Sequence, residues 1–295
     1  MLDTESHTLT VLLMGSSGLL GSHLKIALEQ NGLSVTGLSA NKVADIKVDA
    51  SRKTALFASL SGKRFDVIVN LIGLTSVETC EDYPDLAHRT NTLPAENAAS
   101  WVMEVSPATH LVQISTDHVY DGKGPHSESD TSMVNTYSLT KYAGELGAKL
   151  VPSSILRTNF VGKSTVYGRV SLTDWIFDSL KNEEHIEVLD DVMFSPVSID
   201  TLCSVIFDVI RKRPVGTFNL GSSDGMSKAD FDFQFADCLG LETKFMTRIE
   251  ASGARFLRAR RPLDMRMDSS KLEECLGIKL PTLDEEIRMV AMQYE

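Results

Sequence analysis

The stretch MGSSGLLGS, residues 14–22, places Gly15, Gly18 and Gly21 directly after an apolar run and before a helical pattern. In that context a G-x-x-G-x-x-G spacing provides a tight turn, close approach of the backbone to a pyrophosphate, and close packing of a helix on a strand. The N-terminus of the following helix adds N–H groups and a favourable dipole for phosphate. The stretch therefore predicts a dinucleotide-binding strand–turn–helix unit rather than an ordinary glycine-rich turn.

The chain around this unit alternates short apolar runs with helical stretches. Continuous apolar strands separated by helices indicate a parallel sheet covered on both faces, which is the doubly wound α/β (Rossmann) pattern. We expect strands at 8–15, 33–39, 44–50, 65–73, 109–116 and 153–159. Helices are expected at 19–31, from a cap at Ser51 to about Leu60, at 85–104 with a break at 91–94, and from about Tyr137.

The rhythm loosens after about residue 160. Helices are expected at 171–182, 200–212, 227–239, 268–276 and 282–293, and a strand at 216–223. No clean linker or repeat divides this part from the first. We expect a dinucleotide-binding domain over 1–160 and, over 161–295, mainly a smaller substrate-binding lobe that packs on the sheet and is interleaved with it rather than independent.

Composition narrows the class of protein. A formal net charge of −11 argues against a general nucleic-acid surface. An anionic ligand would need local cations, and one arginine cluster could supply them. The alternative is that the cluster is a charged face exposed to solvent. Its members are Arg255, Arg258, Arg260, Arg261 and Arg266.

The four cysteines are far apart and lack metal-type spacing, which predicts free thiols, a reducing compartment and no metal site. The polar N-terminus lacks a signal-peptide core, and no apolar run approaches the ~20 residues of a membrane span. We therefore expect a cytoplasmic enzyme or binding protein without a membrane or nucleic-acid partner, and a homodimer remains open.

The second strand bears on the choice of cofactor. NAD sites usually place an acid after this strand to hold the ribose 2′-hydroxyl. Residues 37–42 read GLSANK and contain no acid. Ser39, Asn41 and Lys42 would instead accept a 2′-phosphate, unless the loop contacts nothing. The segment favours NADP, with NAD as the alternative.

A tyrosine–lysine pair occupies the stretch YSLTKYAGE, residues 137–145. Tyr137 and Lys141 share one helix face, and a nearby ammonium lowers a phenol pKa from its usual value of about 10. Such pairs also arise by chance on helix surfaces. Ser115, Thr116 and Asp117 end the preceding strand, where ligands of a doubly wound sheet bind. A hydroxyl beside a proton-donating tyrosine predicts carbonyl reduction, with hydride from a nicotinamide.

Four stretches together resemble a known family. They are GSSGLLG, VNLIGLTSVETCEDYPDLAHRTN, STDHVYDGKGPHSESD with YSLTKYAGE, and RPLDMRMDSSKL, spread from residue 15 to 272. The chain resembles the extended short-chain dehydrogenases/reductases, and most of all the dTDP-4-dehydrorhamnose reductase family of dTDP-rhamnose biosynthesis. The resemblance implies NADPH-dependent reduction of a nucleotide-linked 4-keto sugar, with deoxythymidine as the first choice of nucleoside.

The resemblance also implies roles for individual residues. Thr116 would bind the carbonyl oxygen, Tyr137 would donate the proton, and Lys141 would lower the tyrosine pKa and hold the nicotinamide ribose. The implied cofactor contacts are Gly15, Ser17, Gly18, Leu19 and Leu20 at the pyrophosphate, Asp49 and Ala50 at the adenine, and Ile72, Gly73 and Leu74 along the channel. The implied sugar contacts are Thr75, Val77, Glu78, Asp117 and Phe160, with Arg261 ordering the lobe over the phosphates.

The chain departs from the family at several positions. Leu71, Ile72 and Gly73 stand where the family usually has small alanines, and His118 stands where it has an aromatic residue. His118 would contact the sugar or else face solvent. Phe160 stands where the family often has tryptophan, and simple core packing would also explain it.

Two other functions are open on the same scaffold. An epimerase or dehydratase is one, although related dehydratases place Asp-Glu after the threonine and this chain has Asp117 and His118. The other is a non-catalytic NADP-binding subunit, because the regulatory subunit of methionine adenosyltransferase resembles the same reductases. Thr116, Tyr137 and Lys141 favour catalysis, because binding alone would not require them.

Overall fold

Seven parallel strands form the central sheet in the computed structural model, which describes residues 8–40 and 43–295. They are β1 (Thr10–Met14), β2 (Ser34–Ser39), β3 (Ile46–Lys47), β4 (Val67–Asn70), β5 (His110–Thr116), β6 (Ser153–Thr158) and β11 (Gly216–Leu220). Their order is β11-β6-β5-β4-β1-β2-β3. The order reverses between β1 and β4, as in a doubly wound fold, so the predicted fold class is confirmed.

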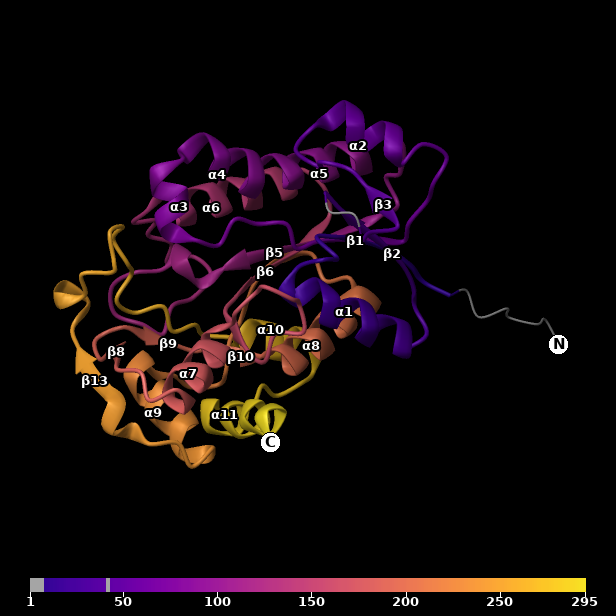
Figure 1. Cartoon of the computed structure of the whole chain (residues 1–295). Coiled ribbons are helices and arrows are strands. Elements are labelled where there is room, and N and C mark those ends of the chain that lie inside the picture. The colour runs from indigo at the N-terminus through magenta and orange to yellow at the C-terminus, as the bar shows by residue number, and fades with distance from the viewer. Residues whose placement is uncertain (1–7, 41–42) are drawn as a thin grey trace.

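Helices cover both faces of the sheet (Figure 1). One face carries α2 (Lys53–Ser59), α4 (Pro84–Asn91), α5 (Leu93–Val105) and α6 (Thr136–Ala148). The other carries α1 (Leu19–Gln30), α8 (Ile199–Lys212) and α10 (Ser270–Leu276). A separate apolar core fills each interface, and the sheet residues are buried on both sides.

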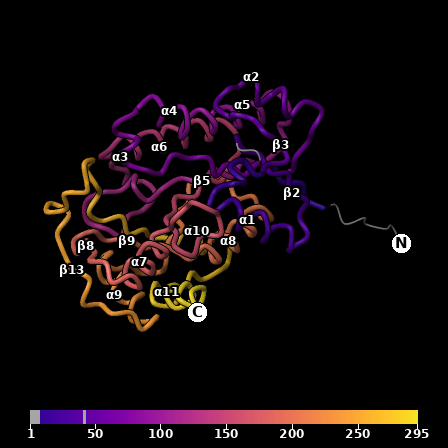
Figure 2. The backbone as a smooth tube through the Cα atoms, viewed as in Figure 1, coloured from indigo at the N-terminus to yellow at the C-terminus, as the bar shows by residue number. Residues whose placement is uncertain are grey.

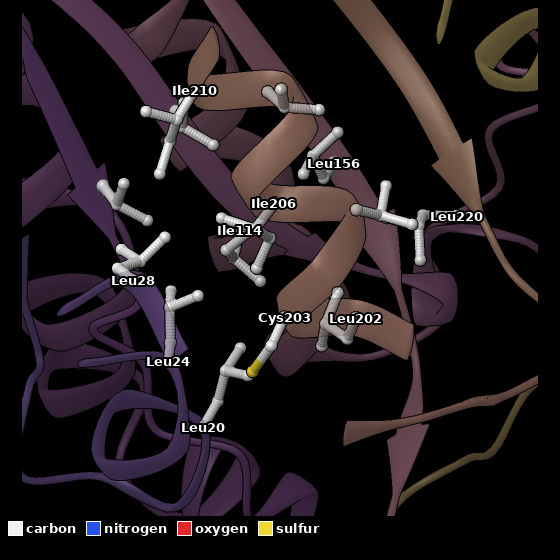
Figure 3. Packing of buried hydrophobic residues seen from close by; sticks show 14 of the residues in the cluster. Leu20, Leu24, Leu28, Ile114, Leu156, Leu202, Cys203, Ile206, Ile210 and Leu220 are labelled. Atoms are coloured by element: carbon white, nitrogen blue, oxygen red, sulfur yellow. The ribbon is translucent and has the colours of Figure 1, made fainter. Parts of the chain in front are cut away.

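The core under α8 shows why the sheet needs this helix. Leu202, Ile206 and Ile210 recur at i, i+4 and i+8, and they face the sheet and α1 (Figure 3). Leu24 and Leu28 approach from α1, and all five side chains are fully buried. Burial of one such side chain contributes about 1.5–3 kcal/mol relative to its exposure.

A smaller lobe lies beside the carboxyl ends of the strands (Figures 1 and 2). It contains α7 (Leu172–Lys181), α9 (Lys228–Cys238) and α11 (Leu283–Ala291), with β7 (Phe160–Val161), β8 (Ile186–Leu189), β9 (Met193–Phe194), β10 (Val197–Ser198), β12 (Met226–Ser227) and β13 (Met246–Ile249). Phe194 and Phe231 pack edge to face within its own core. The elements of this lobe lie between Phe160 and Ala291, and the same part of the chain also supplies β11, α8 and α10 to the sheet layers.

Two local features differ from the sequence expectations. Ser51 does not cap α2, because its hydroxyl donates to Asp49 Oδ1 at 2.7 Å and Arg52 takes the cap position. The short helix α3 (Val77–Asp82) was not expected, because its six polar-rich residues carry little periodicity. The break at 91–94 is confirmed, since Pro94 in the first turn of α5 cannot donate back to α4.

The remaining short elements are single turns. They are the 3₁₀ helices η1 (Asp117–Val119), η2 (Thr243–Phe245), η3 (Ala251–Gly253) and η4 (Met292–Tyr294). All four cysteines are free thiols, as expected. Within residues 8–40 and 43–295, no helix has the length and apolar character that crossing a membrane requires.

Candidate active site

A cavity of about 790 Å³ opens at the carboxyl edge of the sheet. Gly15 follows β1, Leu71 follows β4, and Thr116 ends β5, so the cavity lies at the point where the strand order reverses. The ends of β2 and β6 add Ser39 and Thr158 to its wall. This is the position where open α/β sheets bind their ligands.

The glycine turn lines the cavity, and its three glycines contribute to the turn in different ways. Gly15 has φ +90°, a conformation that a side chain disfavours. A Cβ on Gly21 would lie 2.2 Å from the Gly15 carbonyl oxygen, so α1 can pack on the turn only without it. Gly18 begins α1 without a side-chain cap. The first N–H groups of α1 are therefore suited to a phosphate, and the turn fits a dinucleotide.

The adenosine-side residues predicted from the sequence also line the cavity. Ser39, Asp49 and Ala50 are on its wall, together with Ser17, Leu19 and Leu20 of the turn. Asn97 donates to the Ala50 carbonyl at 2.9 Å, which fixes this wall to α5. Lys42 lies outside the described residues, so its predicted contact with a 2′-phosphate stays a prediction.

Thr116, Tyr137 and Lys141 meet at the middle of the cavity. Asn135 caps α6 by accepting from Ser138 N at 2.9 Å, which sets Tyr137 in the first turn of the helix. One turn later, Lys141 Nζ donates to the Ile114 carbonyl at 2.7 Å. Ile72 and Gly73 form the adjoining wall after β4. The predicted convergence of these side chains is therefore present.

The electrostatics of this group differ from the expectation. Burial raises the pKa of Tyr137 above its ordinary value, and a hydrogen bond with Thr116 opposes that rise. Burial also lowers the pKa of Lys141 to about 8, with Glu145 opposing. The Lys141 ammonium donates to the Ile114 carbonyl. The expected lowering of the phenol pKa is absent in this arrangement.

Three of the residues predicted to contact a sugar, Thr75, Asp117 and Phe160, line the cavity. Asp117 is buried, accepts from Asn159 Nδ2 at 2.8 Å, and has its pKa raised to about 6 by burial. His118 lies edge-on to Tyr137, with ring centroids 5.2 Å apart. His118 also lines the cavity, so it does not simply face solvent.

Four predicted residues lie outside the cavity wall. Leu74 N donates to Asn91 Oδ1 at 2.6 Å, and Val77 is buried in a small apolar cluster beside Tyr137. Glu78 accepts from Arg261 Nη2 at 2.5 Å. These pairings hold Leu74, Val77, Glu78 and Arg261 in the surrounding scaffold.

Four of the five arginines in the cluster, Arg258, Arg260, Arg261 and Arg266, are ion-paired. Arg258 pairs with Asp82 at 2.7 Å, and Arg260 pairs with Asp121 at 2.9 Å. Arg266 pairs with the neighbouring Asp264. Figure 1 shows the segment after β13 extending from the lobe toward α3. In this structure Arg258, Arg260 and Arg261 attach the lobe to the sheet domain through their ion pairs, so these three do not present unpaired cations to a ligand.

Several cavity residues were missed by sequence reasoning. Asn159 follows β6 at the same sheet edge as Thr116, so the rule that found Thr116 would also have found it. Arg89 on α4 and Arg169 before α7 bring cations to the wall, and isolated arginines carry no sequence signal. Among the residues that the structure describes, no cluster of metal-ligating side chains occurs.

The fold and this cavity define a doubly wound α/β protein of the dinucleotide-binding class. Residues 9–295 match the family of the RmlD substrate binding domain, and the chain belongs to that family. The family-level resemblance found in the sequence is therefore confirmed.

Similar proteins cover nearly the whole chain. dTDP-4-dehydrorhamnose reductase of Sinorhizobium fredii is 27% identical over 88% of this chain and 93% of its own length. Methionine adenosyltransferase 2 subunit beta of Pongo abelii is 26% identical over 91% of this chain and 82% of its own. The crystal structure of dTDP-4-dehydrorhamnose reductase from Bacillus anthracis, in complex with NADP, superposes with a TM-score of 0.87 at 23% identity, covering 97% of this chain and all of that one.

Proposed function

We propose that this protein reduces the keto group of a nucleotide-linked 4-keto sugar with NADPH, and that NADH is the alternative cofactor. One observation carries the proposal: Thr116, Tyr137 and Lys141 line a single cavity together with the glycine turn. A reductase needs its proton donor and its cofactor site in one cavity. Membership of the RmlD substrate binding domain family supports this reading.

The cofactor contacts follow from the cavity wall. Gly15, Gly18 and the start of α1 would hold the pyrophosphate, and Ser39 would lie near the adenosine ribose. When bound, the nicotinamide supplies the hydride. Lys141, from the floor of the cavity, would hold the nicotinamide ribose by its ammonium.

The proton chemistry belongs to the protein. Thr116 would donate a hydrogen bond to the sugar carbonyl oxygen, and Tyr137 would deliver its phenolic proton to that oxygen as negative charge develops there. A raised phenol pKa keeps Tyr137 protonated at neutral pH, as a proton donor requires. Thr116 and Tyr137 would share the oxygen, because both side chains line the same cavity.

A nucleoside diphosphate hexose is the proposed substrate class, with deoxythymidine first. A cavity of about 790 Å³ is in the range of small-molecule sites, ~300–1,000 Å³, and the lobe adds one wall through Phe160, Arg169 and Ser171. Arg169 from the lobe and Arg89 from α4 supply cations to the cavity. The named activity of the Sinorhizobium fredii relative supports the 4-keto sugar. Residues 1–160 would mainly bind cofactor and residues 161–295 mainly substrate.

The direct test is consumption of NADPH with a panel of dTDP- and UDP-linked 4-keto sugars, followed by identification of the product. We expect turnover with at least one dTDP-linked member and a 4-hydroxy product. Absence of turnover with every member, together with no shift of the melting temperature by dTDP, would contradict the proposal.

A non-catalytic subunit is the second candidate, favoured by the similarity to methionine adenosyltransferase 2 subunit beta. This function predicts cofactor binding without turnover. It also predicts that this protein binds a catalytic partner enzyme and that adding this protein changes the activity of the partner. Cofactor binding measured alongside turnover separates the two functions.

A further inference from the structure

Residues 164–171 form a largely exposed loop that leads from β7 to α7 and is closed at its base by one carboxylate. Ser164 N donates to Asp174 Oδ2 at 3.1 Å, and Ser171 N donates to the same oxygen at 2.9 Å. Tyr294 donates to the other oxygen of this carboxylate at 2.6 Å. Both ends of the loop are therefore fixed to α7 of the lobe.

The same loop contacts the first helix of the sheet domain. Thr165 Oγ1 lies 3.4 Å from Ser22 Oγ and 3.2 Å from His23 Nε2, within hydrogen-bonding distance of both. Ser22 and His23 lie near the start of α1, directly after the glycine turn. The loop therefore joins the lobe to the helix whose first N–H groups are suited to a phosphate.

One cation of this loop lies on the cavity wall. Arg169 and Val170 line the cavity together with Gly18 and Leu19. Arg169 N donates to the Val166 carbonyl at 3.0 Å, a turn that brings the arginine back toward the contact with α1. Among the residues that the structure describes, its exposed guanidinium has no hydrogen-bond or ion-pair partner. Arg169 is therefore a cation available to a ligand, unlike the ion-paired arginines after β13.

We propose that Arg169 binds the pyrophosphate of the dinucleotide and thereby fastens the lobe to the bound cofactor, an inference that rests on the proposed function. A guanidinium presents a planar set of donors that matches two phosphate oxygens. The chain has a net charge of −11, so an anion at the glycine turn gains from a nearby cation. The contact of Thr165 with α1 places the loop at the cofactor end, which favours the cofactor over the sugar nucleotide as the ligand of Arg169.

The test measures dissociation constants of the wild-type protein and of Arg169→Met for NADPH, NADH and dTDP. NADPH and NADH share the pyrophosphate and differ in the 2′-phosphate, whereas dTDP carries only the diphosphate of the proposed substrate. Arg169→Met should weaken NADPH and NADH by the same factor, about 10-fold, and should leave dTDP within about 2-fold of the wild type. Arg169→Lys keeps the charge without the planar fork, so it should recover part of the loss.

Two further variants examine position and charge separately. Thr165→Val removes the contact with α1 and should weaken NADPH and NADH by about 3-fold. In the Arg169→Met background the same change should add little, because Thr165 acts by positioning the arginine. Arg64→Met is the control, because it removes an exposed arginine that precedes β4, at the sheet edge opposite the cavity. It should leave all three dissociation constants unchanged.

Each other result overturns the assignment. A loss confined to NADPH would place Arg169 at the 2′-phosphate, and a loss confined to dTDP, or shared equally by dTDP, would remove the preference for the cofactor. A loss below about 2-fold for all three ligands would mean that Arg169 contacts no phosphate. In these cases the proposed function stands. If the wild-type protein binds neither NADPH nor NADH, the proposed function falls and the inference with it. Melting temperatures report folding, and Thr165→Val carries the test if Arg169→Met does not fold.

Discussion

Glu145 on α6 and Arg157 on β6 form a fully buried, two-bond ion pair. Arg157 Nε and Nη2 donate to the two carboxylate oxygens at 2.9 and 2.7 Å. Glu145 also accepts from Ser115 at 2.6 Å, next to Thr116. The pair therefore fixes the helix that carries Tyr137 and Lys141 to β6, and the Ser115 bond fixes the same helix to the strand that carries Thr116.

Glu145→Gln should be strongly destabilising. The change leaves the Arg157 guanidinium buried without a compensating charge, which typically costs about 3–5 kcal/mol. Urea unfolding of the variant measures the loss. Lys53→Met breaks an exposed pair with Glu104 and should change the free energy of unfolding by less than about 1 kcal/mol. Equal effects of the two changes would contradict this role for the buried pair.

Gly21→Ala should disrupt the glycine turn. Its Cβ would overlap the Gly15 carbonyl, so α1 must shift, and overpacking of this kind costs about 1–3 kcal/mol. We expect lower thermal stability and weaker NADPH binding in titrations. Gly253→Ala is the matched control, because nothing lies within 4 Å of its added Cβ. Unchanged NADPH affinity in Gly21→Ala would argue against the assigned phosphate site.

Tyr137→Phe should remove turnover and leave NADPH binding unchanged. The ring is buried, so its packing survives, while the proton donor is lost. General acid catalysis contributes about 10²–10⁴-fold, and kcat should fall by that factor. Stopped-flow turnover and NADPH titration measure the two effects. A variant with nearly wild-type kcat would show that another group donates the proton.

The protein should bind NADPH more tightly than NADH. The cavity wall at the end of β2 presents Ser39 and not an acid. Ser39→Glu should weaken NADPH binding by more than about tenfold, because the new carboxylate repels the 2′-phosphate. The same change should favour NADH binding. Fluorescence titrations with both cofactors test the order. Tighter NADH binding by the wild-type protein would mean that Ser39 does not select the cofactor.

Cofactor affinity should fall at alkaline pH through Lys141. Its pKa is lowered to about 8, so its ammonium is present below that pH and is lost above it. NADPH affinity should stay level below pH ~7 and decline by up to about tenfold per pH unit above pH ~8. Lys141→Arg keeps its charge and should flatten the profile. A wild-type profile that stays level to pH 10 would exclude Lys141 from the ribose contact.

Local pattern was enough to predict the sheet and several of the residues that line the cavity. Strand and helix periodicity placed β1, β4, β5 and α6 within a few residues, because fully buried strands and one-sided helices have distinct apolar spacings. Because ligands of open α/β sheets bind at the carboxyl ends of the strands, the position of Thr116 at the end of β5 was enough to predict that it lines the site. Residues four apart share one face of a helix, so the spacing of Tyr137 and Lys141 was enough to predict that they point the same way.

Sequence alone determined the fold class and the convergence of Thr116, Tyr137 and Lys141, because both follow from contacts that are local or repeat along the chain. Tertiary structure alone decided the pairing of Arg261 with Glu78 and of Arg258 with Asp82. These contacts join segments more than 100 residues apart, so no spacing records them. Burial is equally a property of the whole fold, and it raised the pKa of Tyr137 where helix spacing had predicted a lowering.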